Sequence, residues 1–325
     1  MTESKRRKLR AASASRPARS EAKPSEDRTG RRAKTSGGAR AWLDGRVIPL
    51  DEARIPLNDH GLLYGDGIFE GIRITAGRVF RLDDHLARFA VSARAIGLEL
   101  PGGVAAARAA VLATARAFAQ PEAYARLVCT RGVGALGVDP LPCHAPRLFC
   151  IVDQIRLYDE RQQSEGLDLV TVSVRRPSAD VLDPRVKSLN YLNNVLAKRE
   201  ARLRGADEAL VLNAHGNIAE ASVANLFCVR DGMLFTPPAT DGALEGITRR
   251  TVLELARELA IPAEERTLGR FDLFASAEAF LTGSGAGLVP VRSLDGERIG
   301  GAGPIFRRIR RAFTDAAPAL GVPFH

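Results

Sequence analysis

Two side chains, a lysine and a glutamate set among small and apolar neighbours, are the groups in this sequence best placed to do chemistry. Lys187 lies in the run RVKSLNY (residues 185–191), and Glu220 lies in the run IAEAS (residues 218–222). An amine that is kept away from water or close to other cations loses affinity for its proton and becomes a nucleophile toward carbonyl groups. The alternatives are a surface lysine ahead of a helix and a solvated turn glutamate.

Two further places in the chain suit a negatively charged group. Ile247 and Thr248 begin a predicted helix, whose free N–H groups and dipole attract anions, although Thr248 could instead be an ordinary N-cap. Ser284 follows a predicted strand in the glycine-rich run TGSGAG (residues 282–287), where a hydroxyl and main-chain N–H groups are available. A phosphate group would suit both places.

Short strands and two helices account for residues 41–152. The strands are predicted at residues 41–43, 47–50, 68–75, 79–80, 125–130 and 147–152, with DG and AG pairs at turns. Apolar residues at helical spacing predict a helix from about Asp83 to Gly97, and an alanine-rich helix spans residues 104–119. The glycine-rich loop 131–140 between the last two strands is of a kind that often lines sites.

The second part of the chain mixes strands and helices in the same way. We expect strands at 167–174 and 278–281, helices at 191–204, from Thr248 and at 304–316, and a three-strand meander at 208–212, 223–229 and 233–235, with Glu220 on a turn. The pattern indicates an α+β fold with a cleft between two domains. We assign a small domain to residues 41–152, a linker to 153–166 and a large domain to 167–325.

The positive charge of the chain is confined to one end. Residues 1–40 hold thirteen Lys/Arg and four Asp/Glu, which is the whole formal net charge of +9, so the rest of the 325-residue chain is neutral. Few large apolar residues occur in this stretch, and we expect a disordered basic tail. A polyanion-binding arm and an organellar transit peptide are alternatives to a plain solvated extension, which we favour, so no nucleic-acid partner is expected.

The cysteines and the hydropathy of the chain indicate its compartment. Cys129, Cys143, Cys150 and Cys228 fall at irregular separations without a C-x-x-C pair, as is typical of reduced structural thiols. No apolar run is long enough to span a membrane. We expect a cytoplasmic protein without a membrane partner and without a metal site.

Six short motifs are distributed along residues 41–313. They are YGDGIFEGIR (64–73), HLAR (85–88), KSLNY (187–191), EAS (220–222), GIT (246–248) and TGS (282–284). Through these motifs the sequence resembles the class-IV aminotransferases, which are pyridoxal 5'-phosphate enzymes of fold type IV, and most closely the branched-chain amino acid aminotransferases. The resemblance implies a two-domain α+β fold, similar to that of D-amino acid aminotransferase, with the cofactor in the cleft.

The resemblance also implies roles for particular residues. It assigns Lys187 to the Schiff base with the cofactor's aldehyde, Glu220 to the pyridine nitrogen, where a carboxylate makes the ring an electron sink, and Tyr191 to the phenolic oxygen. The residues expected to contact the phosphate are Arg88, Ile247, Thr248 and Ser284. For Arg88 the alternative is an ion pair on its helix face.

The resemblance also indicates which residues bind the substrate. By the resemblance, Tyr124 and Arg126 match a Tyr-x-Arg pattern that branched-chain enzymes place around the substrate and the distal carboxylate of glutamate. The expected substrate-binding residues are Tyr64, Phe69, Arg73, Tyr124, Arg126 and Gly285, with Leu136 as a further apolar wall. Gly285 stands where a residue with a side chain is more usual in the family, which leaves the width of the pocket open.

Two other activities of the family are matched less well. D-amino acid aminotransferases have an Arg-x-His pair after a Thr-Arg-Gly-like strand end, whereas the run TRGVG (130–134) of this chain has no such histidine. Aminodeoxychorismate lyases have Arg-Gly-Tyr where this chain reads LGV (136–138). We therefore expect a transaminase that moves an amino group between a branched-chain L-amino acid and 2-oxoglutarate, in a homodimer or larger homo-oligomer. The lyase and the D-specific transaminase are the alternatives.

Overall fold

The structure is a computed structural model that describes residues 38–155 and 157–325. The predicted basic tail falls on residues 1–37, outside the described residues, and on residues 38–40. Arg40, which we assigned to the tail, is the first residue of the first strand.

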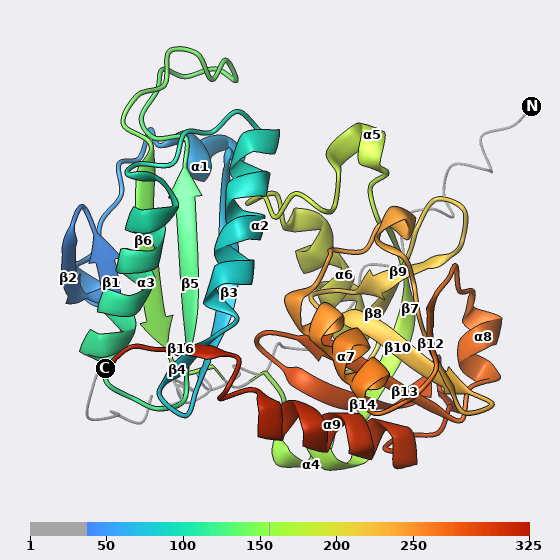
Figure 1. Cartoon of the computed structure of the whole chain (residues 1–325). Coiled ribbons are helices and arrows are strands. Elements are labelled where there is room, and N and C mark those ends of the chain that lie inside the picture. Colours follow the sequence, from blue (N-terminus) through green and yellow to red (C-terminus); the bar gives the residue numbers. More distant parts are fainter. Residues whose placement is uncertain (1–37, 156) are drawn as a thin grey trace, which may run out of the picture. The chain divides into compact units, whose positions relative to one another are not determined.

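A seven-stranded antiparallel sheet occupies the first part of the chain (Figure 1). Its strands, in spatial order, are β16 (Gly321–Pro323), β4 (Arg78–Phe80), β3 (Gly67–Thr75), β5 (Ala123–Thr130), β6 (Arg147–Asp153), β1 (Arg40–Leu43) and β2 (Arg46–Pro49). Its helices are α1 (His60–Tyr64), α2 (Leu82–Ala95) and α3 (Gly103–Phe118). We assigned the end of the chain to the large domain (167–325). Because β16 pairs with β4, the last residues instead belong to the first sheet.

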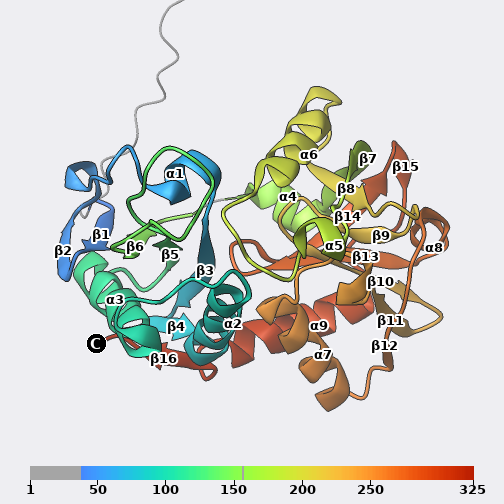
Figure 2. The same cartoon turned by 90° about the horizontal axis from the view of Figure 1, so that it is seen from above.

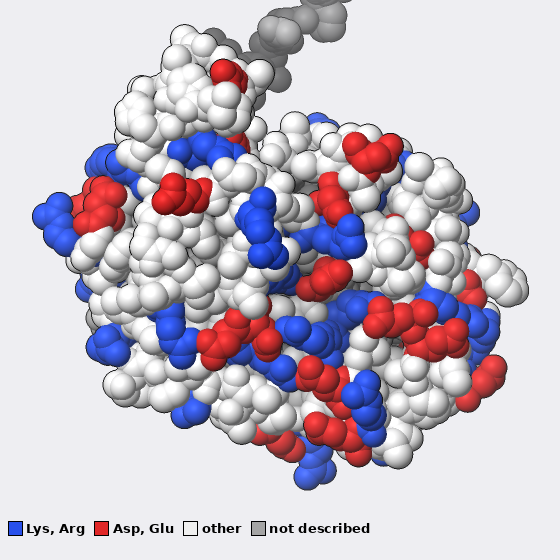
Figure 3. Space-filling view, turned by 45° about the horizontal axis from the view of Figure 1, so that its top comes forward, with Lys and Arg blue, Asp and Glu red and all other residues white. Residues whose placement is uncertain are grey.

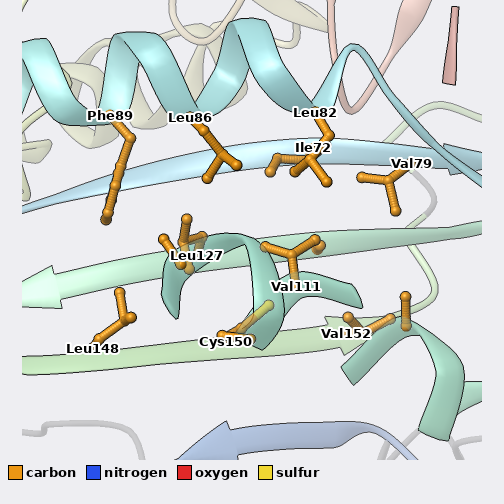
Figure 4. Packing of buried hydrophobic residues seen from close by; sticks show 14 of the residues in the cluster. Ile72, Val79, Leu82, Leu86, Phe89, Val111, Leu127, Leu148, Cys150 and Val152 are labelled. Carbon is orange, nitrogen blue, oxygen red and sulfur yellow. The ribbon is translucent and has the colours of Figure 1, made fainter. Parts of the chain in front are cut away.

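The core of this sheet follows from the helical spacing seen in the sequence. Leu82, Leu86 and Phe89 point from α2 toward the sheet, where they meet Ile72 of β3 and Leu127 of β5 (Figure 4). All five side chains are at most 2% exposed. This packing fixes α2 against β3, which matters because both elements contribute to the site described below.

A second, mixed sheet occupies residues 167–298. Its strands, in spatial order, are β12 (Ala263–Glu265), β11 (Met233–Thr236), β10 (Asn225–Arg230), β13 (Glu278–Gly283), β14 (Gly287–Leu294), β7 (Leu167–Arg175), β8 (Glu208–Leu212) and β9 (Ile218–Ala221), and β15 (Glu297–Arg298) pairs with β14. The helices after residue 155 are α4 (Glu160–Glu165), α5 (Ala179–Leu182), α6 (Leu192–Leu203), α7 (Ile247–Glu258), α8 (Arg270–Phe274) and α9 (Pro304–Ala316).

The predicted three-strand meander is wrong. β8 pairs with β7 and β9, whereas β10 pairs with β11 and with β13, which comes some fifty residues later. Glu220 accordingly lies in the buried strand β9 and not on a turn. The sequence reading failed here because a glutamate in a four-residue strand interrupts the apolar pattern, and because strand pairing depends on distant segments.

Apolar contacts also join the two sheets. Phe80 of β4 packs in one cluster with Phe306 and Phe313 of α9 and with Val252 of α7. Its ring lies 5.5 Å from that of Phe313, edge to face. On the face drawn in Figure 3, basic and acidic side chains are interspersed. Within residues 38–155 and 157–325, no helix has the length and apolar character needed to cross a membrane.

Candidate active site

The segment that carries Lys187 is fixed by the first sheet. The N–H of Phe69 donates to the carbonyl of Lys187 at 2.9 Å, and the N–H of Leu189 donates to the carbonyl of Gly67 at 2.9 Å. The N–H of Lys187 also reaches the hydroxyl of Ser92 on α2, at 3.2 Å. The segment thus adds a short antiparallel pairing to the end of β3, where Figure 2 shows the chain between α5 and α6 reaching that strand.

The amine of Lys187 points into a cavity, which we call the Lys187 cavity. Eleven of the thirteen residues predicted for the site line it: Phe69, Arg88, Tyr124, Arg126, Lys187, Tyr191, Glu220, Ile247, Thr248, Ser284 and Gly285. The Nζ atom donates to the Tyr191 hydroxyl at 3.1 Å and lies 4.6 Å from the centre of the Phe69 ring. It forms no ion pair with the residues that the structure describes. The neighbours of the amine are therefore a hydroxyl group and aromatic rings.

Glu220 faces the same cavity and is held by three donors. Its Oε1 accepts from Nη2 of Arg176 at 2.8 Å, and its Oε2 accepts from Nδ2 of Asn225 at 3.0 Å and from the N–H of Leu244 at 3.1 Å. Burial raises the pKa of Glu220, while the charge of Arg176 and the Leu244 bond act in the opposite direction. Three hydrogen bonds therefore fix the orientation of the Glu220 carboxylate, and the ion pair with Arg176 compensates its charge.

Arg88 reaches the cavity from α2 and is tied to both halves of the molecule. Its Nε and Nη2 atoms donate to the two carboxylate oxygens of Glu70, each at 2.8 Å, and its Nη1 donates to the carbonyl of Glu245 at 2.6 Å. The alternative considered above, an ion pair, thus exists, but with a buried strand residue and not on the helix face. Arg88 still lines the Lys187 cavity.

The start of α7 also lines the Lys187 cavity. The helix begins at Ile247 with Gly246 as its N-cap, so Thr248 is the second helical residue and not the cap. The hydroxyls of Thr248 and Thr282 are buried and have no hydrogen-bond partner among the described residues. Both residues line the cavity together with Ser284. Buried hydroxyls are rarely left without a partner, which marks this end of the cavity as a place for a polar ligand.

Gly246 is a glycine because of a close approach and not because of its backbone angle. Its φ of −67° is accessible to any residue. A Cβ atom at this position would overlap Oδ1 of Asn225, whose amide nitrogen also bonds to Glu220. The contact between Gly246 and Asn225 thus joins the start of α7 to the carboxylate of Glu220.

Aromatic rings surround the cation at the other end of the cavity. The Arg126 guanidinium lies 4.4 Å from the centre of the Phe69 ring and 5.7 Å from that of Tyr124. It forms no ion pair within the described part of the chain. An unpaired cation with apolar walls can accept a carboxylate or leave room for an aliphatic group.

Two of the residues predicted to bind substrate do not line the cavity. Arg73 donates from Nε to the carbonyl of Ser284 at 3.0 Å and from Nη2 to that of Gly285 at 2.6 Å, so it braces the turn after β13. Tyr64 accepts a bond from the N–H of Gly137 at 2.8 Å and is 36% exposed. Leu136, expected as an apolar wall, is 85% exposed and is also absent from the lining.

The sequence reading missed several side chains that hold the site. They are Glu70, Arg176, Asn194 and Asn225. Glu70, Arg176 and Asn194 bond to residues 18, 44 and 28 positions away in the sequence, so no local pattern identifies them. Asn225 bonds to Glu220, five positions away. A glutamate within the apolar run of β3 was the one available signal, because a charged residue is rarely buried without a partner.

Comparisons with known proteins place these features in a family. Residues 67–294 match the family model described as amino-transferase class IV. A Methanocaldococcus jannaschii protein, named provisionally as a branched-chain-amino-acid aminotransferase, is 42% identical over 86% of this chain and 97% of its own length. Crystal structures of branched-chain aminotransferases from Thermoproteus uzoniensis, with norvaline, and from Thermobaculum terrenum, in its PLP form, superpose with TM-scores of 0.81 and 0.79. Their identities are 36% and 32%, over 87% and 88% of this chain and 96% of each of theirs.

Proposed function

Because the chain belongs to the class-IV aminotransferases, which are pyridoxal 5'-phosphate enzymes, we propose that it moves an amino group between a branched-chain L-amino acid and 2-oxoglutarate, with Lys187 as the residue that binds the cofactor. One observation carries the proposal: Lys187, whose amine has no ion pair with any described residue, and the buried carboxylate of Glu220 line one cavity. Glu220 is suited to the ring nitrogen, and Tyr191 to the phenolic oxygen beside Lys187.

The phosphate group of the cofactor fits the end of the cavity near α7. The unpartnered hydroxyls of Thr248 and Thr282 are donors that a phosphate would satisfy. The start of α7 adds free N–H groups, and Arg88 adds a positive charge. Arg88 belongs to α2, which packs on the first sheet, whereas Thr248 and Thr282 belong to α7 and to β13 of the second sheet, which supports a cofactor bound between the two sheets.

The cofactor, when bound, supplies an aldehyde and a ring that accepts electron density from the α-carbon of the substrate. Lys187 then holds or moves a proton at Nζ, and the neighbouring Tyr191 hydroxyl receives one of its hydrogen bonds. Glu220 would hold the ring nitrogen, and the charge of Arg176 offsets part of the cost of burying this carboxylate. Each half of the reaction is the reverse of the other, so ping-pong kinetics are expected.

The choice of substrates is proposed from the other end of the cavity. Arg126 suits the distal carboxylate of 2-oxoglutarate, and the rings of Phe69 and Tyr124 suit an aliphatic side chain. The relatives named above support this choice, since one structure holds norvaline, an aliphatic amino acid. Arg131 does not line the cavity and is bound to Asp66 by two hydrogen bonds of 2.9 and 3.0 Å.

A second copy of the chain is the proposed partner. Apolar side chains are exposed at two places, on and around the loop after β5 and along α6: Leu57, Leu62, Leu136, Val138, Leu141, Leu192, Val195 and Leu203. Exposed apolar area of this kind is typical of a surface covered by another subunit. Light scattering at micromolar concentration should give a dimer or a multiple of it.

A cytoplasmic location and the absence of a nucleic-acid partner are also part of the proposal. All four cysteines are free thiols, as expected in a reducing compartment. Deletion of residues 1–37 tests the polyanion-binding alternative, which predicts lost function, whereas the enzyme proposal predicts unchanged turnover.

One assay separates the candidate activities. Purified protein with cofactor is supplied with L-leucine, D-alanine or aminodeoxychorismate, with and without 2-oxoglutarate. The proposal predicts formation of glutamate from L-leucine only when 2-oxoglutarate is present. Pyruvate release from aminodeoxychorismate without an acceptor would instead identify a lyase, and turnover of D-alanine a D-specific enzyme.

A further inference from the structure

Glu70 is a second buried carboxylate, in the first sheet, that the proposed function does not use. Its side chain is fully buried. Phe69 and Gly71, its neighbours in β3, line the Lys187 cavity. Because side chains alternate along a strand, Glu70 points to the opposite face, toward α2. There it meets Arg88 and His85.

The hydrogen bonds of Arg88 show how Glu70 orients this guanidinium. A guanidinium has five N–H groups. The Nε–H and one N–H of Nη2 donate to Glu70, and one N–H of Nη1 donates to the carbonyl of Glu245. One N–H therefore remains on each terminal nitrogen, in a residue that lines the cavity. Two such groups are what a phosphate needs for a bidentate contact.

His85 holds the carboxylate in place from the other side. Its Nδ1 lies 2.7 Å from Oε2 of Glu70, and its ring is fully buried. Burial lowers the pKa of His85, which leaves a neutral ring that donates from Nδ1. Burial would raise the pKa of Glu70, but Arg88 and His85 hold it well below its ordinary value. Glu70 is thus a charged acceptor with a fixed orientation.

We propose that Glu70 is a positioning residue that orients Arg88 for the phosphate group of the cofactor, and that His85 fixes Glu70. The inference rests on the proposed function in one respect, since it requires a phosphate-bearing cofactor in the cavity. If the pair only stabilised the fold, its loss would weaken every cofactor analogue alike.

The test compares two cofactor forms that differ in the phosphate. Apoenzyme is titrated with pyridoxal 5'-phosphate and with pyridoxal, and binding is followed by absorbance. In Glu70→Gln we expect the preference for the phosphorylated form to fall roughly 10- to 100-fold, as for the loss of a charge-assisted contact. Pyridoxal itself should bind within about threefold of wild type. Combining Glu70→Gln with Arg88→Gln should lower the preference no further than Arg88→Gln alone.

A matched control exists in the second sheet. Glu208 is also fully buried and is paired with a cation, Lys198, away from the cavity. Glu208→Gln should leave the preference for the phosphorylated form unchanged. If Glu70→Gln fails to fold, Glu70→Asp, which keeps the charge but shortens its reach, should lower the preference by an intermediate amount.

The outcomes distinguish this inference from the proposed function. Wild-type protein that shows no preference for the phosphorylated cofactor would contradict the proposed function itself. A clear wild-type preference that both Glu70 variants retain would overturn the role of Glu70 alone. An equal loss of affinity for both cofactor forms would also overturn it, because it would indicate a purely structural ion pair.

Discussion

The two ends of the Lys187 cavity are built differently. At the cofactor end, Glu220 and Arg88 each have three bonds to other protein groups, on elements packed into a core. At the substrate end, the Arg126 side chain lies beside two aromatic rings and forms no hydrogen bond or ion pair with the described residues, and Leu136 is exposed. The difference shows that the groups for the cofactor must be held in one orientation, whereas the group for the substrate must not. A single cofactor permits fixed partners, whereas two unlike substrates require a cation that is not already committed to a carboxylate.

The largest effect is expected at Lys187. Lys187→Ala should lower turnover of L-leucine by about 10⁴-fold or more, because it removes both the nucleophile and the proton carrier. Lys198 is a good control, since it is the other lysine between residues 38 and 325 and is bound to Glu208. Lys198→Arg should keep turnover within about twofold of wild type. A steady-state assay in which Lys187→Ala lost less than tenfold would contradict the assignment.

The next effect concerns the stability of the cofactor end. Glu70→Gln should destabilise the fold by about 3–5 kcal/mol at pH 7, because it leaves the Arg88 charge buried without its partner. Urea unfolding measures the change, and a loss below about 1 kcal/mol would contradict it.

The same variant should flatten the acid limb of the stability profile. The pKa of Glu70 is lowered in the folded state, so the unfolded state binds more protons as pH falls below about 4.3. The stabilisation from ionised Glu70 is present above that pH and is lost as the pH falls further. Wild type should therefore lose more stability than Glu70→Gln between pH 5 and pH 2, and parallel profiles would contradict the shift.

At the substrate end, a substitution should change preference and leave cofactor binding alone. Arg126→Leu should raise the KM for 2-oxoglutarate roughly 10- to 100-fold, because it removes the cation for the distal carboxylate. The KM for L-leucine should change by less than about threefold, and cofactor affinity should be unchanged. Equal losses with both substrates would show that Arg126 acts on the structure and not on specificity.

The smallest effect is expected at Gly246, where the start of α7 approaches Asn225, which bonds to Glu220. Gly246→Ala should weaken cofactor affinity about tenfold, because the added Cβ displaces Asn225 and with it one bond to Glu220. Gly216 is a control, since a Cβ there meets no other atom within 4 Å, although its positive φ costs some stability. Gly216→Asn tolerates that φ and should keep cofactor affinity unchanged. An equal loss in both variants would contradict the steric account.

The sequence predicted the parts of the molecule that depend on local pattern. The helix α2 follows from the spacing of Leu82, Leu86 and Phe89, and eleven of thirteen predicted site residues line one cavity. What it missed depends on distant partners: the strand that carries Glu220, the pairing of β10 with β13, and the contact of Glu70 with Arg88. Tyr64 and Arg73 were placed by motif alone, and a motif does not fix the direction of a side chain.

The most direct test of the central claim is to find which lysine holds the cofactor. Protein loaded with pyridoxal 5'-phosphate is reduced with borohydride, which makes the attachment permanent, and the peptides are identified by mass spectrometry. The account predicts one labelled peptide, the one that contains Lys187. A label on Lys198 or on a lysine of residues 1–37, or the same labelled yield from Lys187→Ala, would contradict it.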